Sequence, residues 1–276
     1  MSILEAIIFG IVQGITEFLP ISSTAHIVIT QLLLGYNFPG FAFEIFLHLA
    51  SILAVIIYFR KDLWKVITGF FSYFKEKSPE NKTQFWFAIY IVVATFITGG
   101  LGVVLKDIFD ESMKRPLTIS ITLAITGVAL IYIERFHRYG KREEKDMNLK
   151  DSFIVGLGQT IAVFPGISRS GATLVVALLA GLSRETAVRY SFLLSIPVIL
   201  GSTVLAFGDV TTDMLTAIGT PALIVSFIVT FIFSWLGIVW LIDFLKRSKL
   251  IYFAVYCFIA AILVYIFIPA DTVMNL

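Results

Sequence analysis

Two stretches of this sequence place side chains that could handle phosphate inside otherwise apolar segments. The first, "GITEFLPISSTAH" (residues 14–26), carries Glu17, Ser23 and His26, and the second, "VFPGISRSGAT" (163–173), carries Arg169. A serine becomes a nucleophile when a neighbouring base takes its proton, and a guanidinium suits bidentate binding of phosphate oxygens. Ionisable groups within membrane segments are functional candidates by default. These residues predict an anion site, with phosphate as the preferred ligand, and phosphoryl transfer to a serine.

The first stretch offers one nucleophile and two bases. Ser22 is expected to be the N-cap of the following helix, so Ser23 is the better nucleophile. His26 follows Ser23 by three residues on the same helical face, and Glu17 could orient that imidazole or act as the base itself. A structural ion pair between Glu17 and Arg169 is the alternative, but it leaves the serine cluster and His26 unexplained. Whether Ser23 or His26 becomes phosphorylated is left open.

Other polar residues around these groups are expected to hold the substrate. Two helix N-termini, with unpaired N–H groups and a positive dipole end, meet here. The expected phosphate-binding residues are Ser22, Thr24, Ser168, Arg169, Ser170 and Gly171. The expected supporting residues are Gln13, which lies one turn before Glu17, its counterpart Gln159, and Glu44, which is spaced i, i+4 from His48.

The composition is that of an integral membrane protein. The 276 residues are 58% hydrophobic and only 14% charged, whereas soluble domains are about 45–50% apolar and about 25% charged. The net charge of +2 does not suggest a nucleic-acid partner. The only cysteine, Cys257, is expected to pack within a span. The first helix is expected to be retained and not cleaved as a signal peptide.

The apolar segments predict an all-α integral membrane protein with six transmembrane helices and two re-entrant helical hairpins. The expected spans are about 41–59, 84–105, 116–134, 186–207, 217–243 and 250–268. Residues 3–34 and 152–182 are each broken near the middle by proline and small polar residues, which predicts a helix, an irregular tip and a second helix. Non-helical backbone at membrane depth must be covered by protein or line a cavity, so the tips should form a site.

The two broken segments match each other when the chain is shifted by 146 residues. The pairs are Gly10 with Gly156, Gln13 with Gln159, Ile15 with Ile161, Phe18 with Phe164, Ile21 with Ile167 and Ser22 with Ser168. This predicts a single membrane domain, 1–276, built from repeat halves of approximately 1–140 and 147–276. A hairpin followed by three crossings in each half gives an inverted-topology repeat with its site near the midplane.

The distribution of positive charge predicts the orientation. Four loops on one side (60–83, 135–151, 183–189 and 244–249) hold seventeen of the 21 Lys and Arg residues. By the positive-inside rule this side is cytoplasmic. Both termini and the mouth of the first hairpin are then expected to face outward.

"QGITEFLPISSTAH" and "PGISRSGAT" resemble the two signature motifs of the bacterial undecaprenyl pyrophosphate phosphatases, the bacitracin resistance protein family, and the hydrophobic layout is similar over essentially the full chain. The resemblance implies hydrolysis of undecaprenyl diphosphate to the monophosphate carrier used in cell-wall synthesis, together with bacitracin resistance. It also implies that the protein lies in the cytoplasmic (inner) membrane of a bacterium. It also implies essential roles for Glu17, Ser23, His26 and Arg169. Family members use Mg²⁺ or Ca²⁺, for which Glu17 is the best candidate ligand. The family has Glu or Gln at the position of Gln13. This chain has Gln, so it offers a metal no second carboxylate there.

The predicted function is a membrane-embedded phosphatase with a polyprenyl diphosphate lipid as substrate. The main alternative is a transporter or flippase for polyprenyl phosphate that uses the same anion site without a covalent step. An intramembrane serine protease would also use serine and histidine, but Arg169 argues for a phosphate ligand. The preferred chain length is left open, and so is a homodimer.

Overall fold

The computed structural model describes residues 1–36, 42–106, 115–136, 140–205, 216, 218–247 and 249–269. Within these ranges the chain is helical, and the only β-type pairing is an isolated bridge between Arg142 and Leu182. This confirms the predicted all-α class.

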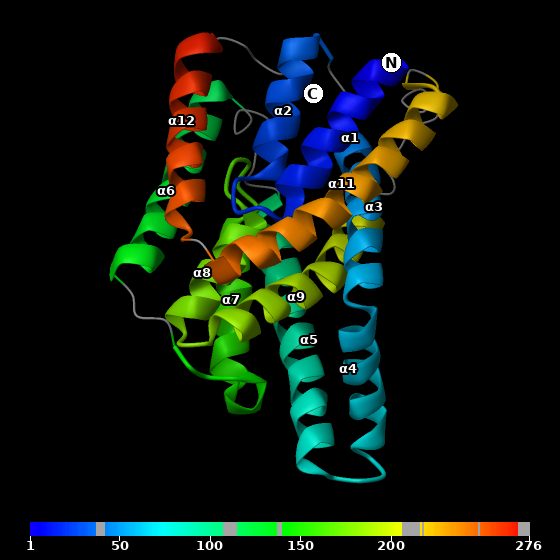
Figure 1. The fold of residues 1–276 in the computed structure, drawn as a ribbon, viewed down its shortest axis with the longest axis vertical. Coiled ribbons are helices and arrows are strands. Elements are labelled where there is room, and N and C mark those ends of the chain that lie inside the picture. The colour runs from blue at the N-terminus through cyan, green and yellow to red at the C-terminus, as the bar shows by residue number, and fades with distance from the viewer. Residues whose placement is uncertain are drawn as a thin grey trace.

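Each broken segment forms two short helices that meet at an irregular tip. The first hairpin consists of α1 (Ile3–Phe18) and α2 (Ser23–Leu34), and the second of α7 (Leu149–Ile161) and α8 (Arg169–Leu179). Pro20 and Pro165 lie in the two breaks, where a missing backbone donor costs no helical hydrogen bond. The hairpins enter from opposite ends of the molecule, and their tips face each other in the middle (Figure 1).

Helices also form in the six segments that the sequence predicts as membrane spans. Among the described residues, four helices are long and apolar enough to cross a membrane: α5 (Pro79–Lys106), α6 (Pro116–Phe136), α9 (Arg184–Leu205) and α11 (Thr220–Arg247). A fifth is reached if α3 (Ala42–Tyr58) and α4 (Arg60–Ser72), which are bent by 73° at their junction, count as one span. The last helix, α12 (Ile251–Phe267), is apolar but has only 17 residues. The chain is therefore a multi-pass membrane protein.

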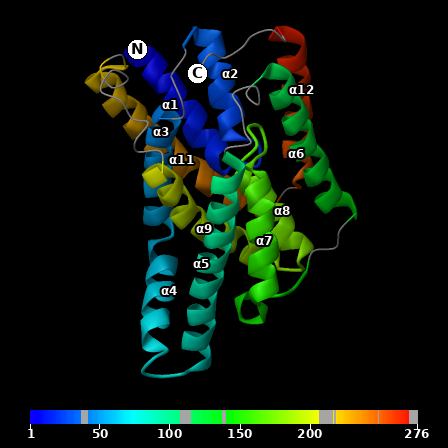
Figure 2. The ribbon, with the colours of Figure 1, turned by 180° about the vertical axis from the view of Figure 1, so that it is seen from behind.

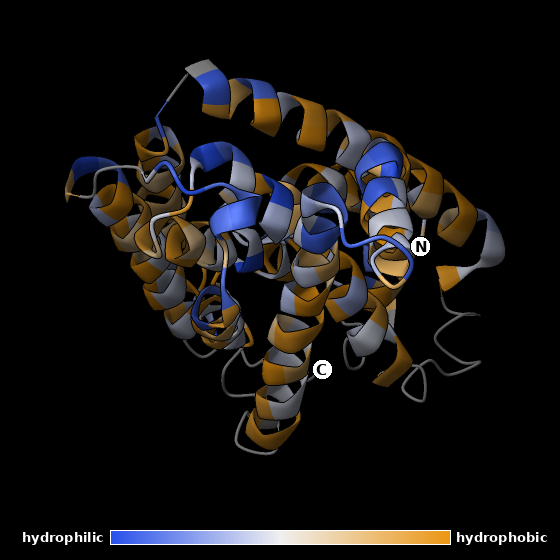
Figure 3. Ribbon diagram, turned by 90° about the horizontal axis from the view of Figure 1, so that it is seen from below, coloured by the Kyte–Doolittle hydropathy of each residue, from blue (hydrophilic) through white to orange (hydrophobic). Residues whose placement is uncertain are grey.

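The outer surface of the helix bundle is suited to lipid. Large apolar side chains on the long helices remain exposed, including Phe96, Val204 and Ile259. Viewed from below, the helices are mainly hydrophobic, while hydrophilic residues gather in connecting loops and at helix ends (Figure 3). This distribution matches a protein whose helix flanks contact hydrocarbon and whose loops contact water.

Each hairpin packs against a long helix that comes from the other half of the sequence. Helix α1 packs along α11, and α7 packs along α5. A Cβ atom added to Gly10 would stand 2.8 Å from Val229 Cβ, and one added to Gly156 would stand 3.1 Å from the Ala94 carbonyl oxygen. These glycines let two backbones approach closely, which is typical of helix contacts in membranes. Figure 2 shows α5 and α7 side by side from behind.

The second hairpin is anchored at its base by an ion pair. Arg142 donates from Nη1 to Asp151 Oδ1 at 2.9 Å and from Nη2 to Asp151 Oδ2 at 2.6 Å, in the bidentate geometry that guanidinium and carboxylate favour. Asp151 also completes the capping box of α7 with Asn148. These contacts raise the pKa of the Arg142 guanidinium. They fix the start of α7 and hence the direction in which the hairpin enters the bundle.

Candidate active site

The first tip places Glu17 and Ser23 on either side of a strained turn. Glu17 lies in the last turn of α1, and Ser23 opens α2. Between them, Ser22 has φ 69°, which is uncommon for a residue with a side chain, and its Oγ accepts from Ala25 N at 3.4 Å. Ser22 is therefore the N-cap, as predicted. The turn keeps the Ser23 hydroxyl beside the Glu17 carboxylate.

The second tip is capped in the same way but is bound to the first. Ser168 Oγ accepts from Gly171 N at 3.1 Å and caps α8, which begins with Arg169. The hydroxyls of Ser168 and Ser170 both donate to the Leu19 carbonyl oxygen, at 3.4 and 3.0 Å. The N-termini of α2 and α8 are thus held in one region, as expected from the sequence.

Glu17 is the centre of the site and is almost completely buried. Arg169 Nη2 donates to Oε1 at 2.6 Å, and Ser23 Oγ donates to Oε2 at 2.7 Å. Gln13 Nε2 also donates to Oε2, at 2.8 Å, so the predicted supporting role of Gln13 beside Glu17 agrees with its geometry. A buried carboxylate needs such partners, because an unpaired charge is costly to remove from water. The ion pair between Arg169 and Glu17, which was the structural alternative in the sequence analysis, is present, and Ser23 and Gln13 bind the same carboxylate.

The two histidines differ from the sequence-based interpretation. His48 Nε2, on α3, lies 3.0 Å from Glu17 Oε2. The ring of His26 points toward α12: Nδ1 is 2.7 Å from the Ser22 carbonyl oxygen, Nε2 is 2.7 Å from the Tyr256 hydroxyl, and the two rings stack. The expected pairing of His26 with Ser23 was therefore wrong for this geometry. His26 bonds back to the carbonyl four residues earlier, as helical spacing allows, and Ser23 turns to Glu17 instead.

These groups line a polar cavity of about 200 Å³. Of the predicted residues, it is lined by Glu17, Ser22, Ser23, Thr24, Gln159, Ser168 and Arg169. His48 and Thr98 also line it, as do Val198 and Ile199 of α9. Gln159 Nε2 donates to Thr98 Oγ1 at 2.8 Å, which fixes its amide at the cavity wall. The cavity brings a hydroxyl, a carboxylate and a guanidinium together with two helix N-termini, which are the groups that phosphoryl transfer would use.

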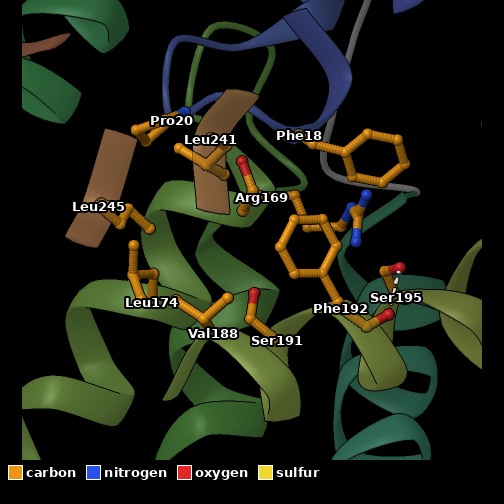
Figure 4. A pocket seen from close by; sticks show the side chains of 11 residues that line it. Phe18, Pro20, Arg169, Leu174, Val188, Ser191, Phe192, Ser195, Leu241 and Leu245 are labelled. Carbon is orange, nitrogen blue, oxygen red and sulfur yellow. Dashed lines mark hydrogen bonds between the residues drawn. The ribbon is translucent and has the colours of Figure 1, made fainter. Parts of the chain in front are cut away.

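Arg169 also lines a second, mainly apolar cavity. Figure 4 shows Phe18, Leu174, Phe192 and Leu241 around it, with Arg169 at one side. Ser170 lines this second cavity and not the polar one. Its predicted role in phosphate binding therefore does not fit this geometry, because its hydroxyl is used to join the tips.

The remaining predicted residues lie near the polar cavity without lining it. The N–H group of Gly171 is taken by the Ser168 cap, so it is not directed at a ligand. Glu44 is buried in the first turn of α3, one turn before His48.

A divalent cation is not provided for by the described residues alone. Mg²⁺ and Ca²⁺ take about six or more oxygen ligands. In the described ranges no group of three or more His, Cys, Asp or Glu side chains could hold a metal ion. Both oxygens of Glu17 already accept hydrogen bonds from the protein. Glu17 is the one carboxylate among the described residues that line the cavity, and a requirement for Mg²⁺ or Ca²⁺ stays a prediction.

Sequence reasoning gave His48 only as the i+4 partner of Glu44, and it missed Thr98; both residues line the cavity. His48 carried a usable signal, since an imidazole in an apolar span is itself unusual and Glu44 precedes it by one turn. Thr98 carried none, because a single threonine in α5 resembles many others that bond to their own helix, as Thr95 does.

Comparisons with known proteins show the family of the chain. A model of the family described as bacitracin resistance protein BacA matches residues 6–263. The chain is 69% identical to undecaprenyl-diphosphatase 2 of Halalkalibacterium halodurans, with 100% of both chains covered. It is 60% identical to undecaprenyl-diphosphatase 1 of Shouchella clausii, covering 97% of each, and 42% identical to undecaprenyl-diphosphatase 3 of Bacillus anthracis, covering 96% of this chain and 98% of the relative. The chain therefore belongs to the BacA family of bacitracin resistance proteins.

Proposed function

We propose that this chain is a membrane phosphatase that hydrolyses undecaprenyl diphosphate to undecaprenyl phosphate and inorganic phosphate. The relatives that it resembles over their full length carry the name of this activity. The observation that carries the proposal is the 2.7 Å hydrogen bond from Ser23 Oγ to the Glu17 carboxylate, whose other oxygen holds Arg169. The product is the lipid carrier of peptidoglycan synthesis. Removal of the diphosphate accounts for bacitracin resistance.

In the first step Ser23 Oγ attacks the terminal phosphorus. A bond forms from Oγ to phosphorus, the bond from phosphorus to the bridging oxygen breaks, and undecaprenyl phosphate leaves as an anion. Glu17 Oε2 takes the hydroxyl proton as general base. Arg169 and the N-termini of α2 and α8 bind the phosphate oxygens and stabilise their charge.

In the second step water attacks the phosphoserine. The bond from phosphorus to Ser23 Oγ breaks, and Oγ regains a proton from Glu17 while Glu17 accepts one from the water. The other water proton stays on the released hydrogen phosphate. Glu17 then gives up its extra proton, so one turnover consumes one water and releases one proton.

The substrate tail and headgroup need different surroundings. The diphosphate enters the polar cavity, and the prenyl tail stays in lipid between the spans. The apolar flanks of α5, α6, α11 and α12 suit such a tail.

We propose that the fold consists of six transmembrane helices and two re-entrant hairpins in one membrane domain. The repeat halves, approximately 1–140 and 147–276, are supported by matching contacts: Gly10 lies against Val229 and Gly156 against Ile97. The helices that the hairpins contact match at a shift of 132 residues, from Ile97 to Val229, whereas the hairpins themselves match at a shift of 146. The first half therefore contains additional residues between its first two spans. Helix α4 lies in that interval and fits such an insertion.

The orientation follows from charge. We propose that the Lys- and Arg-rich loops are cytoplasmic, that the cavity opens to the outer side, and that both termini lie outside. Labelling of single cysteines introduced at positions 2 and 145, in a Cys257→Ala background, with a membrane-impermeant reagent in intact cells tests this. Labelling at 2 and protection at 145 is the expected result.

Two properties stay predictions. A requirement for Mg²⁺ or Ca²⁺ is tested by phosphate release with a chelator present and with each cation restored. A homodimer is tested by the mass of the purified protein in detergent.

The central test is Ser23→Ala in purified protein supplied with undecaprenyl diphosphate. Phosphate release should fall to background, whereas Ser2→Ala, which removes a serine outside the cavity, should leave it unchanged. A phosphoenzyme trapped by rapid denaturation at neutral pH, where phosphoserine and phosphohistidine both survive, should map to Ser23 by mass spectrometry. Phosphate release by the Ser23→Ala protein at the rate of the unmodified one, or a phosphate on His26, would refute this mechanism. Lipid flipping without phosphate release would instead favour the transporter.

A further inference from the structure

His48 is the imidazole that touches the reacting carboxylate. Its Nε2 lies 3.0 Å from Glu17 Oε2, and its side chain is 20% exposed and lines the polar cavity. The position that matches His48 in the second half is Leu194, which is buried in the hydrophobic core. An apolar residue therefore suffices for packing at this point of the repeat, and the imidazole in the first half requires another explanation.

The two oxygens of Glu17 have different partners. Oε1 accepts from Arg169 Nη2, whereas Oε2 accepts from Ser23 and Gln13 and faces His48. Three groups from α1, α2 and α3 thus converge on the oxygen that must take the serine proton. A carboxylate held from three directions cannot rotate freely.

Without this restraint a different arrangement would compete. Guanidinium and carboxylate groups favour a bidentate pair with two parallel hydrogen bonds. A bidentate pair would turn Oε2 of Glu17 away from Ser23 and occupy a second nitrogen of Arg169. In the observed geometry Arg169 uses Nη2 for Glu17, so its other N–H groups can serve phosphate.

We propose that His48 is a positioning residue of the phosphatase reaction, which donates from Nε2 to Glu17 Oε2 and keeps this oxygen aimed at Ser23. The proposal rests on the proposed function and adds a residue outside the two hairpins to it. Helix α3 then supplies part of the site, although the sequence motifs belong to the hairpins alone. The required property is a donor N–H at the correct reach, and not the basicity of the imidazole.

The test compares His48→Leu with His48→Gln, because glutamine offers an amide N–H of similar reach and leucine offers none. Kinetics are measured on purified protein with undecaprenyl diphosphate. His48→Leu should lower kcat about 100-fold, the scale of a small misplacement of reacting groups. KM should change by less than about threefold, because Arg169 and the helix termini remain. His48→Gln should restore kcat to within about tenfold of the unmodified protein.

Controls separate this role from folding and from the proposed function. Gln31→Leu removes a buried amide of α2 that does not line the cavity and should keep the original kcat. If His48→Leu fails to purify as a folded protein, His48→Asn takes its place, since its amide is too short to reach Glu17. An unchanged kcat in His48→Leu, or equal losses in His48→Leu and His48→Gln, would overturn the role of His48. Absence of phosphate release by the unmodified protein would instead refute the phosphatase.

Discussion

The two hairpin tips are alike in construction and different in chemistry. Ser22 and Ser168 match in the repeat, and each caps the helix that follows it. The next position holds Ser23 in the first tip and Arg169 in the second, and Val163 stands where the first tip has Glu17. The matching residues therefore supply the two helix termini, and in the proposed mechanism the residues that differ supply the nucleophile, the base and the cation. In that mechanism one tip reacts and the other binds.

The largest expected effect is at the reacting tip. Glu17→Gln removes the acceptor for the Ser23 proton and should lower kcat about 10³-fold, within the usual contribution of a general base. Phosphate release by purified protein measures it. Glu5→Gln removes a carboxylate of the same helix outside the cavity and should have no such effect. Comparable losses in both proteins would mean that α1 is sensitive to any lost carboxylate and that Glu17 has no special role.

At the binding tip the expected effect is on affinity. Arg169→Lys keeps the charge but loses the planar fork, so KM for undecaprenyl diphosphate should rise about 10- to 100-fold while kcat falls less. Steady-state kinetics separate the two parameters. Arg60→Lys, at an exposed position, is the matched control. A fall in kcat with KM unchanged would place Arg169 with the reacting groups and remove the distinction between the tips.

Much of the fold could be predicted from the sequence because apolar length and helix breaks are local signals. The hairpin boundaries, the N-cap role of Ser22 and the meeting of the two tips all agree with the sequence-based expectations. The last of these followed from matching two distant motifs through the repeat.

What could not be predicted depends on side-chain direction. His26 lies within the signature stretch, yet its ring turns to Tyr256, while His48 reaches Glu17 from another helix. Spacing along a helix gives the face of a residue but not which neighbouring helix that face meets. Likewise, Ser170 looked like a phosphate ligand, but its hydroxyl binds the Leu19 carbonyl oxygen. Contacts between distant segments decide such cases.

The backbone at the two caps also differs, and this predicts a smaller, structural effect. Ser22 has φ 69° and Ser168 has φ −73°. Glycine adopts the positive φ of Ser22 without strain and is itself an acceptable N-cap residue. Ser22→Gly should therefore change the free energy of unfolding by only a few tenths of a kcal/mol, whereas Ser168→Gly, which also loses the bond to Leu19, should cost about 1 kcal/mol. Thermal unfolding in detergent measures both, and a reversed order would show that φ at Ser22 carries no strain.

The smallest expected effect concerns a contact that only the first tip makes. The Tyr256 hydroxyl of α12 bonds to His26 Nε2, and His26 Nδ1 bonds to the Ser22 carbonyl oxygen. Tyr256→Phe keeps the stacked ring and removes one partly exposed hydrogen bond, so stability should fall by about 1 kcal/mol or less and kcat by less than about threefold. His26→Ala removes the stacking and both hydrogen bonds, and should lower kcat more, because the Ser22 turn positions Ser23. If Tyr256→Phe lowered kcat as far as His26→Ala, the Tyr256 hydroxyl itself would be what holds the reacting tip in place.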